Sequence, residues 1–123
     1  EGQRVVSAET AKTVREMLES VVSEDGTARS MQIPGYRVAG KTGTANRYDQ
    51  TTGGYNGYTS SFIGMAPAEN PAFVMAISVH NPKTSTYGSV VAGPVFKTAM
   101  TYALANNKVP PSTSKPPKLP VAW

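Results

Sequence analysis

Hydrophobic residues recur with the spacing of a helix in two segments of the chain. From Ser7 to Val22, apolar positions three or four residues apart predict an amphipathic helix with Ser7 as its N-cap. Gly93-Pro94 predicts the start of a second helix, because proline at the first helical position lacks only an N–H that has no partner there. The apolar stripe of this second helix consists of Phe96, Ala99, Met100, Ala103 and Leu104.

Strand-like segments lie between the two predicted helices. Tyr36–Gly40 is a short strand candidate that runs into Lys41–Thr44. Ser61–Ala66 and Ala72–Val79 are joined by five residues bounded by prolines, which predicts an antiparallel hairpin. Residues 45–59 are polar, contain several Gly and Tyr residues and show no period, so we expect a long loop there.

This order of elements predicts an α+β fold in which an antiparallel sheet lies between helical layers. The run Ala72–Ile77 is apolar on both faces of its strand, so both faces need cover. Two helices and three strands are too few for this, and we expect the remaining cover to come from a preceding part of the same protein or from a partner. Residues 1–105 are therefore expected to be the C-terminal portion of a larger domain. Residues 106–123, which hold five of the ten prolines, are expected to form an extended tail.

Composition narrows the classes of function. The chain has 123 residues with a formal net charge of +4, and a length that suits one domain or a piece of one. The lack of cysteine excludes disulfides and thiolate metal sites, and the single histidine, His80, argues against zinc, so no metal or cofactor is expected. The basic residues are scattered, which favours a solvated surface over nucleic-acid binding. No apolar run approaches the roughly 18–20 residues that span a bilayer, and no signal peptide opens the chain.

The segment Val38–Ala45 carries the residues best suited to chemistry, and that chemistry is anion binding. At about 4 Å and an effective dielectric near 20, Lys41 would gain about 4 kcal/mol with a carboxylate, and the Thr42 and Thr44 hydroxyls about 1 kcal/mol each. Gly43 lets a ligand approach the strand backbone, where an N–H aimed at an oxyanion contributes about 2.7–4 kcal/mol. Alternation puts Lys41 and Gly43 on one face and the threonines on the other, so all four serve one site only if the ligand lies along the strand edge.

Plainer interpretations of the same residues stay open at this point. The glycines can mark only a turn, and Lys41 can be a solvated lysine of an edge strand. A phosphate-binding P-loop is excluded, because no helix is predicted after Lys41-Thr42, where Gly43 and a predicted loop follow. His80 precedes Asn81-Pro82 in a turn context and does not indicate a Ser–His pair.

Lys-Thr-Gly is the third motif of penicillin-binding proteins and serine β-lactamases. Further segments continue the resemblance in the family's order and at its spacing, namely Gly26-Thr27-Ala28, Pro34-Gly35-Tyr36, Val38–Ala45, Ser60–Pro67 and Gly93–Phe96. From Val5 to Leu104 the chain resembles the C-terminal part of the transpeptidase domain of a class B penicillin-binding protein, of the septal type more than the elongation type. The resemblance implies the penicillin-binding transpeptidase and β-lactamase-like fold.

The resemblance also implies a role for each residue of the motif. Lys41 would belong to the electrostatic and proton-transfer network beside the nucleophile. Thr42 and Thr44 would bind the carboxylate of the substrate or β-lactam, and the backbone N–H of Thr44 would form half of the oxyanion hole. Gly43 would let the acyl group lie against the strand.

Three tyrosines and one serine motif complete the comparison with the family. Tyr48, Tyr55 and Tyr58 would lie on the loop flanking the cleft, where packing explains them equally well. The family's Ser-x-Asn motif is absent, and Ser112–Lys115 matches Ser-x-x-Lys only as a string, within the proline-rich tail and after Lys41. We therefore expect the nucleophilic serine on a preceding part of the protein or a companion chain, and this chain alone to lose on the order of 10⁶ in rate.

The complete protein implied by the resemblance is a peptidoglycan D,D-transpeptidase. It would cross-link stem peptides through a serine acyl-enzyme, without a cofactor, and β-lactams would inhibit it. Its partners would be the N-terminal portion with the nucleophile and proteins of division or cell-wall synthesis, at the outer face of the bacterial membrane and anchored by a preceding segment. A β-lactamase or D,D-carboxypeptidase relative and a catalytically silent module are the alternatives.

Overall fold

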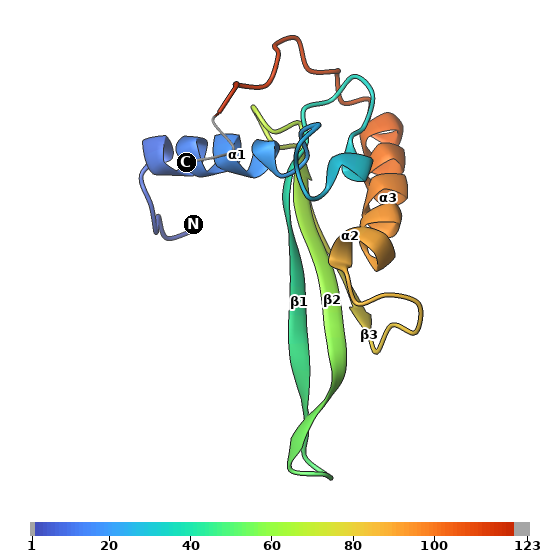
Figure 1. Cartoon of the computed structure of the whole chain (residues 1–123). Coiled ribbons are helices and arrows are strands. Elements are labelled where there is room, and N and C mark those ends of the chain that lie inside the picture. The colour runs from blue at the N-terminus through green and yellow to red at the C-terminus, as the bar shows by residue number, and fades with distance from the viewer. Residues whose placement is uncertain (1, 120–123) are drawn as a thin grey trace.

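A computed structural model of the chain describes residues 2–119. Its elements are α1 (Ala8–Ser20), the 3₁₀ helix η1 (Arg29–Met31), β1 (Ala39–Asp49), β2 (Gly54–Ala66), β3 (Phe73–His80), α2 (Gly88–Val91) and α3 (Gly93–Asn106). The long β1–β2 hairpin extends well beyond the helices, and α1 lies across the end of the sheet where β1 begins (Figure 1). Over the described residues, no helix combines the length and the apolar character needed to cross a membrane.

Both predicted helices form, and local sequence signals account for where they begin. The Ser7 hydroxyl accepts a hydrogen bond from the Thr10 N–H at 3.0 Å, which confirms Ser7 as the N-cap of α1. The Thr10 and Ser7 hydroxyls also bond to each other at 2.8 Å, so Thr10, at the capping-box position of Glu or Gln, contacts the side chain of the cap residue. Helix α3 starts at Gly93 with Pro94 in its first turn, as predicted.

The three strands form one antiparallel sheet in the order β1-β2-β3, which confirms the predicted β2–β3 hairpin. The expectation of a loop over residues 45–59 is wrong, because β1 and β2 pair through most of that segment. The Asp49 carboxylate closes the connecting turn by accepting bonds from the Thr51 N–H at 2.9 Å and the Thr51 hydroxyl at 2.6 Å. Gly57, with a φ of +79°, lies where the register shifts, and a positive φ suits glycine.

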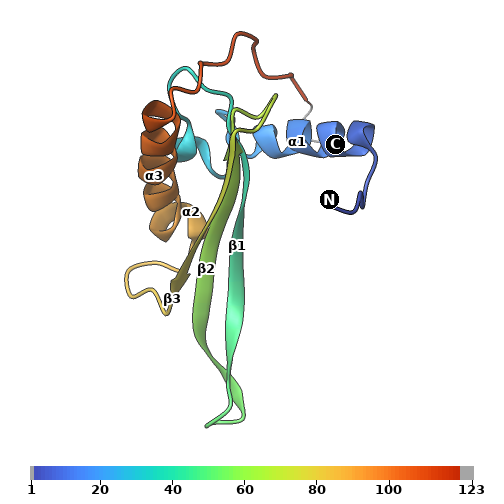
Figure 2. The same cartoon turned by 180° about the vertical axis from the view of Figure 1, so that it is seen from behind.

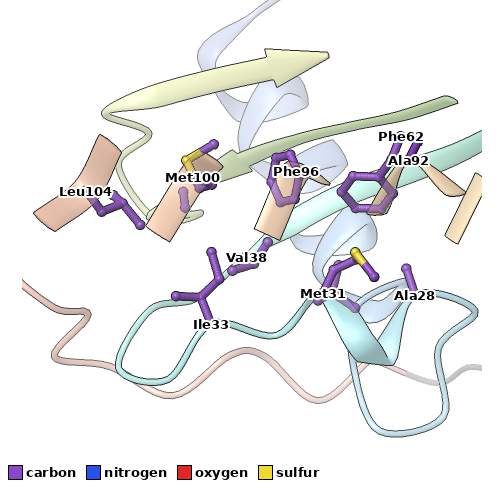
Figure 3. Packing of buried hydrophobic residues seen from close by; sticks show 11 residues of the cluster. Ala28, Met31, Ile33, Val38, Phe62, Ala92, Phe96, Met100 and Leu104 are labelled. Atoms are coloured by element: carbon purple, nitrogen blue, oxygen red, sulfur yellow. The ribbon is translucent and has the colours of Figure 1, made fainter. Parts of the chain in front are cut away.

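One face of the sheet packs against α3 to form the core (Figure 3). The rings of Phe62 on β2 and Phe96 on α3 have centroids 4.7 Å apart at an interplanar angle of 60°. Gly64 permits this contact, because a Cβ there would lie 2.7 Å from the Phe96 ring. Met31 of η1 and residues of α3 complete the group of large buried side chains, which comprises Phe62, Phe96, Met31, Met100 and Leu104.

The opposite face of the sheet has no helical layer among residues 2–119, and the turned view shows it bare along most of its length (Figure 2). On this face Ile63 is 50% and Val74 is 67% exposed. The predicted sandwich therefore has a helical layer on only one face of the sheet. Helices α2 and α3, which follow β3, lie on that side, whereas α1 contacts the end of β1. The α+β class and the antiparallel sheet are confirmed.

After α3, the proline-rich segment forms no helix or strand as far as Leu119. It lies along the chain before β1, where the Tyr36 hydroxyl donates to the Val109 carbonyl at 2.7 Å. Ser112 bonds to the same region, with its N–H on the Gly35 carbonyl and its hydroxyl accepting from the Arg37 N–H, both at 2.9 Å. The division of the chain at residue 105 stays a prediction, and the expected tail beyond Leu119 lies outside the described residues.

Candidate functional site

Lys41 lies on β1, which pairs only with β2 among the described strands and so has a free edge. Its register partner Ile63 lies on the open face of the sheet, and cross-strand partners share a face. The Lys41 Nζ donates to the Thr42 carbonyl at 3.0 Å and lies 3.4 Å from the Thr42 hydroxyl. The ammonium group is therefore at the free edge, beside the first hydroxyl of the motif.

The two threonines occupy the other face, which confirms the alternation expected from the sequence. Thr42 pairs with Phe62 and Thr44 pairs with Ser60, and both partners are buried on the face that α3 covers. The Thr42 carbonyl accepts from Lys41 at the free edge, so the N–H of Thr44, two residues further, points to the same edge. A ligand along this edge would meet a cation, two hydroxyls and a backbone N–H.

This arrangement is suited to holding an anionic group and a developing oxyanion. Lys41 is exposed and Thr42 and Gly43 are half-buried, so the group is accessible while the strand fixes its geometry. Among residues 2–119, no group of three His, Cys, Asp or Glu side chains is placed to hold a metal ion. The nucleophile expected from a Ser-x-x-Lys motif is not beside Lys41 within the described residues: the hydroxyls of Ser112 and Ser114 bond to Arg37 instead.

The three tyrosines lie on strands rather than on the expected loop. Tyr48 and Tyr55 are register partners across β1 and β2, with ring centroids 6.0 Å apart at 81°, an edge-to-face contact. Tyr58 pairs with Asn46, closer to the motif along the hairpin. Cross-strand packing accounts for Tyr48 and Tyr55. A role for any of the three tyrosines beside a ligand stays a prediction.

The loop between β3 and α2 also contacts the motif, although no residue of this loop was predicted to belong to the site. The Thr44 hydroxyl donates to the Thr86 carbonyl at 3.2 Å. The next residue, Tyr87, is 70% exposed. The only signal of this loop in the sequence is Gly88, which follows Tyr87. In the structure Gly88 is buried, and a Cβ added to it would overlap the Ser61 carbonyl oxygen. His80, by contrast, bonds to the Thr59 hydroxyl at 2.9 Å near the end of β3.

Comparison with known proteins settles the family. Residues 1–101 match the family model of the penicillin binding protein transpeptidase domain. The chain belongs to this family. The resemblance inferred from the Lys-Thr-Gly motif and its flanking segments is thereby confirmed.

Relatives within the transpeptidase family cover most of this chain. It is 43% identical over 106 residues to the probable peptidoglycan D,D-transpeptidase PenA of Neisseria flavescens, and 44% identical over 110 residues to stage V sporulation protein D of Bacillus subtilis. These alignments cover 84% and 89% of this chain but only 26% and 17% of the two relatives. The chain thus spans about a quarter or less of the length of these curated relatives.

Solved structures of the transpeptidase family superpose on the same region. The apo transpeptidase domain of penicillin-binding protein 3 from Burkholderia pseudomallei has a TM-score of 0.78 and 48% identity, covering 92% of this chain and 34% of that one. Penicillin-binding protein 3 from Mycobacterium tuberculosis, complexed with ampicillin, also has a TM-score of 0.78. Its identity is 38%, and the match covers 93% of this chain and 27% of that one. The fold assignment therefore rests on both sequence and structure.

Proposed function

We propose that this chain supplies one side of the active site of a peptidoglycan D,D-transpeptidase. The observation that carries the proposal is the free edge of β1, where the Lys41 ammonium, the Thr42 hydroxyl and the N–H of Thr44 lie together. Relatives named as peptidoglycan D,D-transpeptidases support it. The reaction is acyl transfer from a D-Ala-D-Ala donor through a serine acyl-enzyme, and β-lactams acylate the same serine.

Each residue of the motif acts through the group that it presents at this edge. Lys41 provides the positive charge beside the nucleophile and takes part in its proton transfer. Thr42 and Thr44 bind the substrate carboxylate, and the N–H of Thr44 stabilises the oxyanion of the tetrahedral intermediate. Gly43 leaves room for the acyl group along the strand. The part of the hairpin next to the cleft carries Tyr48, Tyr55 and Tyr58.

The nucleophilic serine lies on the N-terminal portion of the same protein, which covers the open face of the sheet. The exposed Ile63 and Val74 on that face support this part of the proposal, because apolar side chains of a sheet are normally covered. The complete enzyme works on the extracytoplasmic face of the bacterial membrane, held by a segment of that portion. A role in division is supported by the relative named peptidoglycan D,D-transpeptidase FtsI, which is 38% identical over 110 residues.

Acylation of the full-length protein by a penicillin tests the proposal. Intact-mass analysis should show the gain of one drug mass, and digestion should place it outside residues 1–123. Lys41→Ala should slow acylation severely, whereas Thr42→Ala should chiefly weaken binding of the carboxylate. Lys83→Ala, which removes a lysine from the loop after β3, is the matched control. Equal acylation rates in Lys41→Ala and the unsubstituted protein would refute the role of Lys41.

Incubation with a stem-peptide donor and an amine acceptor distinguishes the transpeptidase from its hydrolytic relatives. A transpeptidase yields the cross-linked product, while a carboxypeptidase yields only the shortened donor. Mass spectrometry of the products separates the two outcomes.

A further inference from the structure

The Thr86 carbonyl, in the loop between β3 and α2, accepts two hydroxyl donors from neighbouring strands. The Ser60 Oγ donates to it at 2.5 Å and the Thr44 Oγ1 donates at 3.2 Å. Ser60 and Thr44 are register partners on β2 and β1, so their side chains emerge side by side on one face of the sheet. The two bonds fill both lone pairs of the carbonyl oxygen.

The two donors differ in what else they can contact. Ser60 is fully buried, so Thr86 is a partner that it keeps whether or not a ligand is present. Thr44 is exposed at the edge proposed to bind the ligand. Its hydroxyl has a single proton, and while that proton points at Thr86 the oxygen offers a ligand only lone pairs.

A carboxylate has no proton to donate, so it can bond to the Thr44 hydroxyl only if the proton turns away from Thr86. That turn removes one of the two donors from the Thr86 carbonyl. The Ser60 bond, the shorter of the two, keeps the carbonyl satisfied while Thr44 changes partner. Without Ser60, the carbonyl and the ligand would compete for one proton.

Other contacts of this loop keep the Thr86 carbonyl within reach of the strands. At the start of the loop, the Asn81 N–H donates to the Tyr58 carbonyl on β2 at 2.9 Å. At its end, buried Gly88 lies so close to the strands that an added Cβ would be 3.1 Å from the Gly43 carbonyl oxygen. The carbonyl therefore stays between two anchored points when Thr44 releases it.

We propose that Ser60 is a positioning residue that frees the Thr44 hydroxyl to bind the carboxylate of the substrate or β-lactam. The proposal rests on the proposed function, in which Thr44 contacts that carboxylate. Ser60 itself touches no ligand. Its effect is confined to ligands that draw on the Thr44 proton, and this distinguishes it from a serine that only stabilises the fold.

The test compares benzylpenicillin with its methyl ester, a weaker acceptor, as acylating agents of the full-length protein. In Ser60→Ala, the second-order acylation rate constant for benzylpenicillin should fall about fivefold to tenfold, the contribution of one hydrogen bond, while that for the ester changes little. In a Thr44→Ala background, adding Ser60→Ala should cause no further change in the preference for the acid, because the two residues act on one proton. Ser85→Ala removes a different hydrogen bond of the same loop, to the Tyr87 N–H at 3.2 Å, and should leave the preference unchanged.

Each outcome decides between the alternatives. Two results would overturn the positioning role while leaving the proposed function intact. One is an equal fall in the acylation rate constants for the acid and the ester in Ser60→Ala. The other is a further loss of the preference for the acid when Ser60→Ala is added to Thr44→Ala. Failure of penicillin to acylate the unsubstituted protein would overturn the proposed function and this inference with it. If Ser60→Ala does not fold, Ser60→Cys keeps the side chain's shape with a weaker donor and should lower the preference for the acid in the same direction.

Discussion

Replacing Arg37 with Met should destabilise the region where the end of α1, the start of β1 and the tail meet. Arg37 Nε and Nη2 donate to the two carboxylate oxygens of Glu19 at 2.9 and 2.6 Å, and its Nη1 donates to the Ser114 hydroxyl at 2.8 Å. The hydrogen bonds to Glu19 raise the pKa of Arg37 above its ordinary value, so the guanidinium stays charged. A neutral side chain at position 37 would leave the Glu19 carboxylate without this partner.

The exposure of the two side chains sets the size of the effect. The side chain of Arg37 is 12% exposed and that of Glu19 is 4% exposed. Removing one partner of such a buried pair costs about 3–5 kcal/mol, because the other charge is left unpaired, whereas exposed pairs contribute about 0–1 kcal/mol. The local opening constant should therefore rise by roughly a hundredfold to a few thousandfold. Combining Arg37→Met with Glu19→Leu removes both charges and should restore most of the loss.

Amide hydrogen exchange in the full-length protein measures this opening directly. The Ala68 N–H is the reporter, because it donates to the Arg37 carbonyl at 2.8 Å. Arg29→Met is the matched control: its ion pair with Glu24 has side chains 66% and 64% exposed and should contribute less than about 1 kcal/mol. If Arg37→Met opens the region no more than Arg29→Met does, or if the double variant is as unstable as the single one, the buried pair does not stabilise this region as expected.

Two further substitutions test the hairpin turn and the contact between α2 and the strands. The hydroxyl and N–H of Thr51 lower the pKa of Asp49 from 3.8 to about 2, so this carboxylate stabilises the turn fully above about pH 4 and loses that effect as the pH falls through 2. Carbon NMR of the Asp49 carboxyl should show a midpoint near 2 that rises in Thr51→Ala, because this substitution removes the hydroxyl donor and keeps the N–H, and a midpoint near 4 in the unsubstituted protein would contradict this. Gly88→Ala should lower the acylation rate by about 10²-fold, because its Cβ would overlap the Ser61 carbonyl and displace the loop from the motif. Acylation kinetics check this, and a rate equal to that of Ser89→Ala, a neighbouring substitution in α2, would show that the contact is unimportant.

The elements that the sequence predicted correctly are those whose signals are local. Ser7 caps α1, Pro94 opens α3, and the proline-bounded turn joins β2 to β3, each through contacts within a few residues. The polar hairpin from Ala45 onward was missed, because its pairing depends on backbone bonds between strands rather than on an apolar period. The four-residue helix α2 was missed for a related reason, since it is too short to show a period.

The sequence by itself determined the motif at the site and the family to which it points. The residue types of Lys41–Thr44 carry the anion-binding chemistry, and alternation along one strand is enough to assign their faces. Only the tertiary structure decided what surrounds them. Ser60 is an ordinary serine in the sequence, yet it is buried against a carbonyl that the chain reaches 26 residues later, and that carbonyl also holds the Thr44 hydroxyl. Contacts between residues so far apart follow from how strands and loops pack together, which no local pattern specifies.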